Sequence, residues 1–171
     1  PNESGAHTVL PLPMPPSSSR GRFTFNLTFH IRRLATYFAA PPDRLFWEFN
    51  RSFPFDRRLI GEEIAASRGY ALALGRCRAI PAKHAARLDR GLARVLAKYE
   101  ADPSYADIDV EDVHSFVETR LEEEIGPLAG QGHLGRSRNE QSVTALRLFI
   151  RGAIDDLRPR IRDLVEVLAT R

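Results

Sequence analysis

Cysteine is almost absent from this 171-residue sequence, in which Cys77 stands alone. A single cysteine excludes an internal disulfide bond and a cluster of thiolate ligands for a metal ion. The five histidines also lack a His-x-x-x-His spacing, so the sequence predicts no metal site. No apolar run approaches the ~18 residues that a membrane-spanning helix needs, and we expect no membrane partner.

A dense block of one charge is also missing. Lys and Arg number 25 against 22 Asp and Glu, which leaves a net charge of +3. The basic residues are interleaved with acidic ones after position 43. A nucleic-acid-binding stripe or a polybasic membrane patch would need a continuous basic footprint. We therefore expect no nucleic-acid partner.

Residues 1–33 differ in composition from the rest of the chain. They are rich in proline, serine and arginine, and Glu3 is the only acidic residue before Asp43. Such a segment buries little apolar surface, so we expect a disordered leader. Its acid-poor, Ser- and Arg-rich character fits an organelle transit peptide, which would address a plastid. A leader without a targeting role is equally consistent, and a cytoplasmic protein is then expected.

Apolar residues recur at steps of three and four from Pro42 onward, a pattern that predicts amphipathic helices. Strand-like alternation is not evident, so the expected fold class is all-α. The expected helices run from an Asp56 cap to about Gly75, from Pro81 to before Pro103, over 110–125, and from Ser137 to Arg171, with a loop at 127–136. Pro159 is expected to kink or interrupt the last of them.

The last predicted helix keeps an apolar stripe up to Arg171 and has no C-terminal stop signal. A helix with such a face is stabilised mainly by packing that face against partners. We expect that this helix joins an oligomeric bundle, that the chain is the front part of something longer, or both.

The most informative motif is the run Gly135–Gln141. Ser137 followed by Glu140 is a capping box, which opens a helix. Arg136, Arg138 and Asn139 then surround a helix start, where free backbone N–H groups and the helix dipole favour an anion. Guanidinium groups suit forked recognition of carboxylates or phosphates. The run indicates a site for an acidic small molecule, although an ordinary solvated helix start has the same pattern.

Two further segments are candidates for the same site. The first is Phe49-Asn50-Arg51-Ser52, before the first long helix, and the second is Glu111-Asp112-Val113-His114, at a helix start. Asp112 and His114 are two residues apart, so on a helix they point to different sides and cannot form one dyad. Taken alone, Ser52 is more often a turn or capping residue, and His114 a histidine of the core or of a helix surface.

Together the three segments resemble the argininosuccinate lyase family of the aspartase/fumarase superfamily. The resemblance rests on Phe49-Asn50-Arg51-Ser52 with Phe55-Asp56, on Glu111-Asp112-Val113-His114 and on Gly135-Arg136-Ser137-Arg138-Asn139-Glu140-Gln141. It extends over Leu34–Arg171. It implies an N-terminal helical lyase domain over 34–136 and the incomplete beginning of a central helical bundle over 137–171.

The same resemblance implies an activity and its residues. Family members are α-helical homotetramers that cleave argininosuccinate to arginine and fumarate by β-elimination, without a cofactor. Ser52, Arg138 and Asn139 would bind substrate, chiefly through its carboxylates, and Asp112 and His114 would line the site. Arg136 and Ser137 belong to the same substrate-binding motif.

Four departures from the family pattern affect this interpretation. Leu34-Ala35-Thr36-Tyr37-Phe38 stands where the family has Trp-Gly-Gly-Arg-Phe, Leu134 replaces a threonine, and Glu140 replaces an aspartate. The family's acid and base segments would lie beyond Arg171, so no catalytic residue is expected in this chain. Two alternatives therefore remain: a non-catalytic helical scaffold derived from the lyase, such as a crystallin-like protein, and, less strongly, a lyase for another succinylated substrate.

Overall fold

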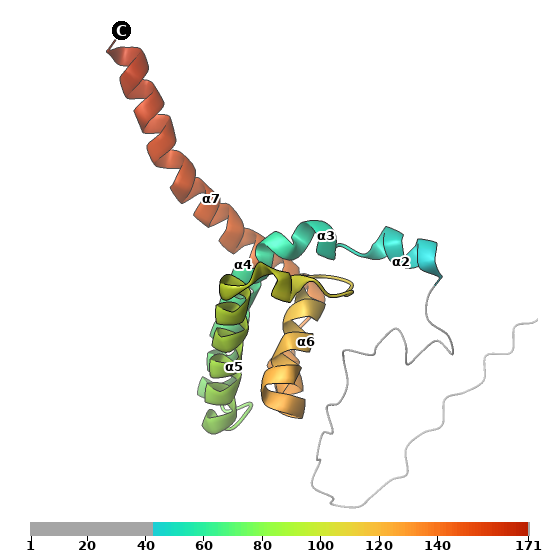
Figure 1. The fold of residues 1–171 in the computed structure, drawn as a ribbon. Coiled ribbons are helices and arrows are strands. Elements are labelled where there is room, and N and C mark those ends of the chain that lie inside the picture. The colour runs from blue at the N-terminus through green and yellow to red at the C-terminus, as the bar shows by residue number, and fades with distance from the viewer. Residues whose placement is uncertain (1–42, 171) are drawn as a thin grey trace, which may run out of the picture.

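The computed structural model describes residues 43–170. The α-helices in chain order are α2 (Arg44–Asn50), α3 (Phe53–Asp56), α4 (Ile60–Arg76), α5 (Ala82–Ala101), α6 (Val113–Ile125) and α7 (Arg138–Ala169). Three 3-10 segments, η1 (Arg57–Leu59), η2 (Pro103–Ala106) and η3 (Gly126–His133), lie between them. These described residues contain no strand, which confirms the predicted all-α class (Figure 1). The predicted leader at 1–33 and the segment 34–38 lie outside them.

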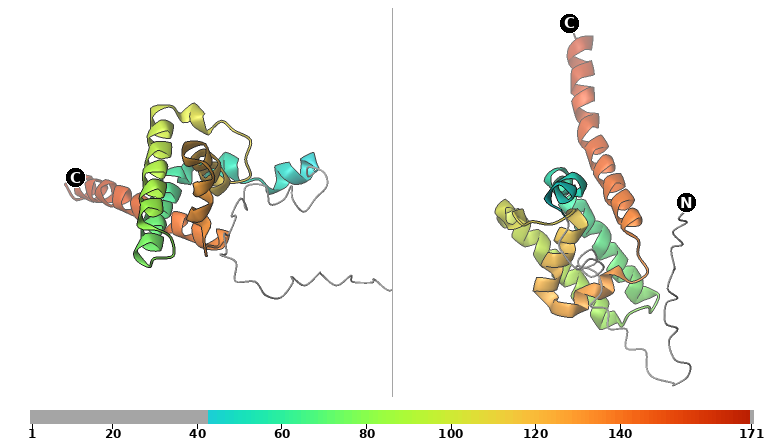
Figure 2. Two further views of the ribbon diagram at one scale, coloured as in Figure 1. Left: turned by 90° about the horizontal axis from the view of Figure 1, so that it is seen from below. Right: turned by 90° about the vertical axis from the view of Figure 1, so that its right-hand side faces the viewer.

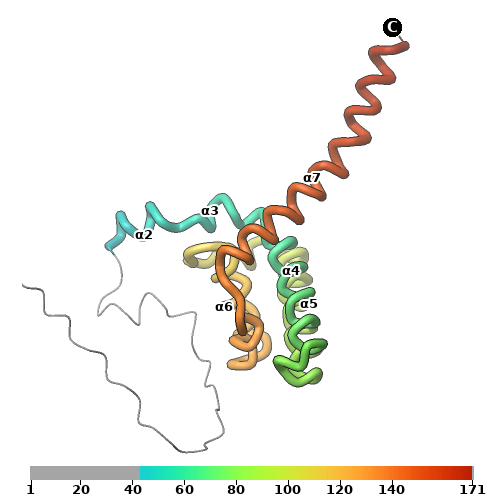
Figure 3. Tube along the Cα trace, turned by 180° about the vertical axis from the view of Figure 1, so that it is seen from behind, coloured from blue at the N-terminus to red at the C-terminus, as the bar shows by residue number. Residues whose placement is uncertain are grey.

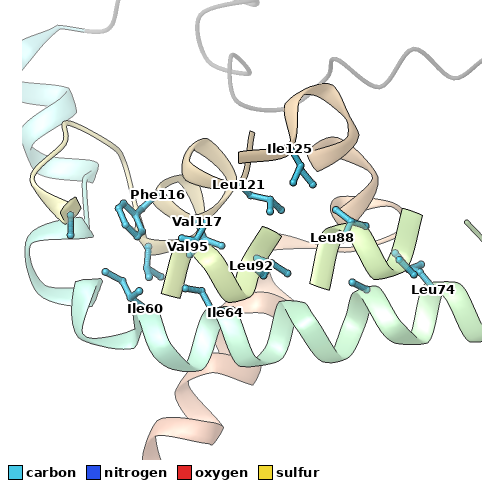
Figure 4. Packing of buried hydrophobic residues seen from close by; sticks show 14 of the residues in the cluster. Ile60, Ile64, Leu74, Leu88, Leu92, Val95, Phe116, Val117, Leu121 and Ile125 are labelled. Atoms are coloured by element: carbon cyan, nitrogen blue, oxygen red, sulfur yellow. The ribbon is translucent and has the colours of Figure 1, made fainter. Parts of the chain in front are cut away.

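The body of the protein consists of α4, α5 and α6, which pack around one apolar core (Figure 4). Each helix buries side chains that recur at steps of three or four, because such residues share one helix face. The buried residues include Ile60, Ile64 and Leu74 of α4, Leu88, Leu92 and Val95 of α5, and Phe116, Val117, Leu121 and Ile125 of α6. Each buried aliphatic side chain contributes about 1.5–3 kcal/mol of hydrophobic stabilisation.

An aromatic cluster attaches α3 and η2 to α6. The Phe116 ring stacks on Phe53 with 5.4 Å between ring centroids and meets Tyr105 edge-on at 6.1 Å. The Arg120 guanidinium lies 4.2 Å from the centroid of the Tyr105 ring and donates to the Tyr105 carbonyl oxygen. Because Phe53 is anchored in this way, the residue before it, Ser52, is held beside the start of α6.

Helix α7 begins against the body and then leaves it. Gln141 and Ala145, in its first turns, are buried against α4. The rest of the helix projects away from α4, α5 and α6 (Figures 2 and 3). From Val143 onward most of its large apolar side chains are exposed, while Leu148 and Phe149 are half-buried. None of the helices between residues 43 and 170 combines the length and apolarity needed to cross a membrane.

Two local predictions are wrong, and a third is wrong in one of its two alternatives. Asp56 does not cap α4, because it is the last residue of α3, η1 separates it from Ile60, and its carboxylate turns to the start of α6 instead. Residues 127–133 are not an irregular loop but part of η3, where Pro127 lies in the first turn and its missing N–H is tolerated. Pro159 does not interrupt α7, since the exposed helix loses one hydrogen bond and water can reach the freed carbonyl. A kink, the other predicted effect of Pro159, stays a prediction.

Gly91 offers a test of the packing between α5 and α6. A Cβ atom at this position would lie 2.7 Å from Leu121 Cδ1 and 2.8 Å from Ile125 Cγ2. We expect Gly91→Ala to lower the free energy of unfolding by about 1–3 kcal/mol through overpacking, although alanine is the better helix former.

The matched control is Gly69→Ala in α4, where a Cβ atom would meet nothing within 4 Å. It should raise the free energy of unfolding by about 0.5–1 kcal/mol through helix propensity alone. Urea unfolding followed by circular dichroism measures both variants. Equal stabilisation by the two substitutions would contradict the close approach of α5 to α6.

Candidate functional site

The three segments singled out in the sequence meet at the N-terminus of α6. The backbone N–H groups of Ser52 and Phe53 both donate to the Glu111 carbonyl oxygen, at 2.8 Å and 3.1 Å. Asp112, the next residue, is the N-cap of α6, and its carboxylate accepts from the Ser115 N–H at 2.6 Å. The first candidate segment is therefore fastened directly to the second.

Asp56 completes this junction, a role that the sequence reasoning missed. Its Oδ2 accepts from the Ser52 hydroxyl at 2.5 Å, and its Oδ1 accepts from the Val113 N–H at 3.1 Å. Burial raises the pKa of the Asp56 carboxyl, although the hydrogen bonds from Ser52 and Val113 oppose this effect. A carboxylate four residues after Ser52 was the available signal, because that spacing places both side chains on one helix face.

Arg138, at the start of α7, connects the third segment to the second. Its Nε lies 3.4 Å from Asp112 Oδ2, and its second ion pair joins Nη1 to Glu118 Oε1 at 3.3 Å. His133 Nδ1 contacts the same Glu118 oxygen at 3.1 Å. The Arg138 side chain is 37% exposed, so its guanidinium is held by two carboxylates of α6 and still reaches the surface.

The predicted capping box is confirmed at the N-terminus of α7. The Ser137 hydroxyl accepts from the Asn139 N–H at 3.3 Å, and the Ser137 N–H donates to Glu140 Oε2 at 3.2 Å. Ser137, Asn139 and Glu140 are all exposed. Ser137 and Asn139 therefore lie on the surface beside Arg138, whose predicted partner is an acidic ligand.

Arg136 occupies a different environment from Arg138. Its side chain is only 6% exposed, donates to Ser67 Oγ at 2.8 Å and lies 3.9 Å from Glu63 Oε1. The guanidinium also lies 5.0 Å from the centroid of the Tyr70 ring, a cation–π contact. Arg136 thus has internal partners that stabilise the loop before α7, and its role in substrate binding stays a prediction.

His114 is buried and does not share a partner with Asp112, as their spacing predicted. Its Nδ1 lies 2.9 Å from Glu63 Oε2, and its Nε2 lies 3.0 Å from the Ser142 hydroxyl. The sequence reasoning missed both partners. For Glu63 a signal was present, because it falls on the same α4 face as the apolar Ile60 and Ile64.

Glu63 is almost fully enclosed, with 1% of its surface exposed. It accepts from Ser67 Oγ at 2.8 Å and from Gln141 Nε2 at 3.1 Å. Burial alone would raise the pKa of the Glu63 carboxyl, but the contact with His114, the charge of Arg136 and the Ser67 hydroxyl outweigh it and lower that pKa. The carboxylate is therefore ionised and links α4 to α6 and α7.

The geometry suits recognition of an anion at the surface. Ser52, Asp112 and Arg138 belong to one connected set of contacts, while Ser137 and Asn139 border it at the start of α7. Within residues 43–170, no three metal-ligating side chains lie close enough together to hold an ion. The role of these residues as substrate ligands stays a prediction.

Comparison with known proteins identifies the class. A family profile described as "Lyase" matches residues 37–171, and the chain belongs to this lyase family, as its resemblance to the aspartase/fumarase superfamily predicted. Among its relatives are the argininosuccinate lyases of Koribacter versatilis (strain Ellin345) and Chlamydomonas reinhardtii, which are 39% and 37% identical over 134 residues. Each alignment covers 78% of this chain and 28% of the relative. The chain thus spans little more than a quarter of the length of these relatives.

The buried carboxylate gives a pH-dependent prediction. A carboxyl whose pKa is lowered on folding adds stability above its unfolded pKa of about 4.3, and this stability is lost as the pH falls through the folded pKa. We expect Glu63→Gln to lower the free energy of unfolding at pH 7 by about 1–3 kcal/mol. Below pH 4.3 the difference from the wild type should shrink.

Urea unfolding at a series of pH values measures this difference. Glu122→Gln, a change at an exposed glutamate of α6, is the control and should leave the wild-type profile unchanged. A Glu63→Gln profile parallel to that of the wild type would show that the Glu63 charge adds no stability.

Proposed function

We propose that this chain supplies carboxylate-binding residues of an argininosuccinate lyase, which cleaves argininosuccinate to arginine and fumarate by β-elimination. The observation that carries the proposal is the junction of Ser52, Asp112 and Arg138 at the start of α6. The proposal is also supported by the relatives, which are named argininosuccinate lyases and are longer than this chain. The acid and base of the reaction come, in this proposal, from parts of the enzyme outside these 171 residues.

The chemistry of the junction fits this reaction. Abstracting a proton next to a carboxylate develops negative charge on that carboxylate, and fixed donors there lower the barrier. Arg138 offers a charged fork that is oriented by Asp112 and Glu118 before any ligand arrives. Exposed Ser137 and Asn139 add polar groups beside it. No cofactor is required, because the elimination involves only proton transfer and departure of the guanidino nitrogen.

A chimera of this chain with the remaining length of the Koribacter versatilis enzyme tests the proposal. We expect the chimera to release fumarate, and Arg138→Ala within it to lower kcat/KM by about 100-fold or more, the usual cost of removing an oriented donor. The absorbance of fumarate measures the rate.

The matched control is Arg147→Ala, at an exposed arginine further along α7, which should keep wild-type kcat/KM. The isolated 171-residue protein should produce no fumarate. An Arg138→Ala chimera with wild-type kinetics would refute the role of Arg138, and turnover by the isolated chain would show that the acid and base lie within it.

We also propose that α7 joins a homotetrameric bundle. Exposed apolar residues follow one face of the helix at steps of three and four: Val143, Leu146, Ile150, Ile154, Leu157, Ile161, Leu164 and Leu168. A continuous apolar stripe of this length is typical of a helix that packs against other helices. A second copy of α7 presents the same stripe and is its natural partner.

Charge placed in the stripe should disrupt this association. We expect the double variant Ile154→Glu, Ile161→Glu to reduce the molar mass of the protein in solution from that of an oligomer to that of a monomer, because charges are costly to bury without partners. Asp163→Lys, on the opposite side of α7, is the control and should keep the oligomer. Light scattering coupled to gel filtration measures the mass, and an unchanged mass in the double variant would exclude α7 as the interface.

A further inference from the structure

The Arg138 side chain contacts α6 and its N-cap directly, and the Arg138 backbone is connected to α6 through Ser142 and His114. Its guanidinium lies between Asp112 and Glu118, and Nη2 is 3.5 Å from the Ser115 hydroxyl. Its carbonyl oxygen accepts from the Ser142 hydroxyl at 3.1 Å. Ser142 follows Arg138 by four residues, so the two lie on the same face of α7.

The Ser142 hydroxyl is in turn held by a buried histidine. Ser142 Oγ lies 3.0 Å from His114 Nε2, and His114 Nδ1 lies 2.9 Å from Glu63 Oε2. A hydroxyl has one hydrogen to donate and can accept others. When Ser142 donates to the Arg138 carbonyl, both ring nitrogens of His114 face hydrogen-bond acceptors. Contacts therefore run from Glu63 of α4 through α6 to the first residue of α7.

This geometry leaves His114 little capacity to bind a ligand. Its side chain is only 4% exposed, and each ring nitrogen already lies within 3.0 Å of a polar atom of the protein itself. Glu63, which lies beside His114, is also occupied by protein groups, because Ser67 and Gln141 both donate to its carboxylate. Contact with a bound anion thus falls to Arg138, which is more exposed.

The start of a helix benefits from such an additional contact. Terminal turns fray because their backbone groups have fewer partners than those in the middle of the helix. A serine hydroxyl that bonds back to the carbonyl four residues earlier tends to bend a helix slightly, unless another group fixes its orientation. Here His114 provides that group, and it is itself oriented by Glu63.

We propose that His114 and Ser142 are positioning residues, which hold the first turn of α7 so that the Arg138 guanidinium stays directed at its anionic ligand. This inference rests on the proposed function, in which Arg138 binds a carboxylate of the substrate. It assigns Ser142 a role that the motif around Ser137 does not include. It also changes the expected role of His114 from lining the substrate site to orienting Arg138.

Nuclear magnetic resonance of the 171-residue chain tests the inference with two readouts. The first is the rate at which the Arg138 Nε–H exchanges with solvent, which reports how firmly Asp112 holds this group. The second is the dissociation constant for fumarate. We expect Ser142→Ala to speed the exchange by about tenfold, the factor that corresponds to one lost hydrogen bond, and to weaken fumarate binding three- to tenfold.

Two histidine variants separate the two contacts of the ring. Glutamine can place its amide nitrogen near the position of Nε2, whereas asparagine reaches only the position of Nδ1. We therefore expect His114→Gln to keep near-wild-type exchange at Arg138, and His114→Asn to behave as Ser142→Ala does. Thr144→Ala removes an exposed hydroxyl from another face of α7 and should change neither readout.

The possible outcomes separate this inference from the proposed function. Unchanged Arg138 exchange in Ser142→Ala would overturn the inference, and this exposed position tolerates alanine without threatening the fold. Equal losses in His114→Gln and His114→Asn would also overturn it, since His114 would then serve only in packing. Wild-type protein that binds no fumarate, with Arg138 exchange still accelerated in Ser142→Ala, would support the positioning role and refute carboxylate binding by this chain.

Discussion

The carboxylate of Glu63 lies in the protein interior, where an ionised group is stable only if other charges and donors replace the water it has lost. Four side chains do so: His114 from α6, Arg136 from the loop before α7, Gln141 from α7 and Ser67 from α4 itself. His114, Arg136 and Gln141 come from α6, α7 and the loop between them, which carry candidate site residues. The relative placement of α4, α6 and the start of α7 therefore depends on keeping this one charge satisfied.

Beside this buried centre, Arg138 shows how the proposed anion site is prepared before a ligand arrives. Its guanidinium already contacts Asp112 and Glu118, so a ligand carboxylate must share or displace these partners. That competition weakens binding of any single charge, but it fixes the direction of the fork at no further entropic cost when the ligand arrives. A site arranged in this way favours a ligand that presents several acceptors at once over a simple anion.

Helix α7 serves two environments along its length. Its first turns bury Gln141 and Ala145 and carry the polar groups of the site, whereas its later turns expose an apolar stripe. If those turns join a bundle of several copies, association and ligand binding share one continuous helix. Changes in packing along the stripe can then reach Arg138 through the helix backbone.

Features that depend on neighbouring residues could be determined from the sequence alone. The all-α class follows from residue periodicity, and the capping box of Ser137 and Glu140 is set by residues three apart, so both predictions are confirmed. Contacts between distant residues required the tertiary structure. Asp56 meets Val113 across 57 positions and Glu63 meets Gln141 across 78. Such pairs depend on how helices cross, and this geometry arises only when whole apolar faces pack together.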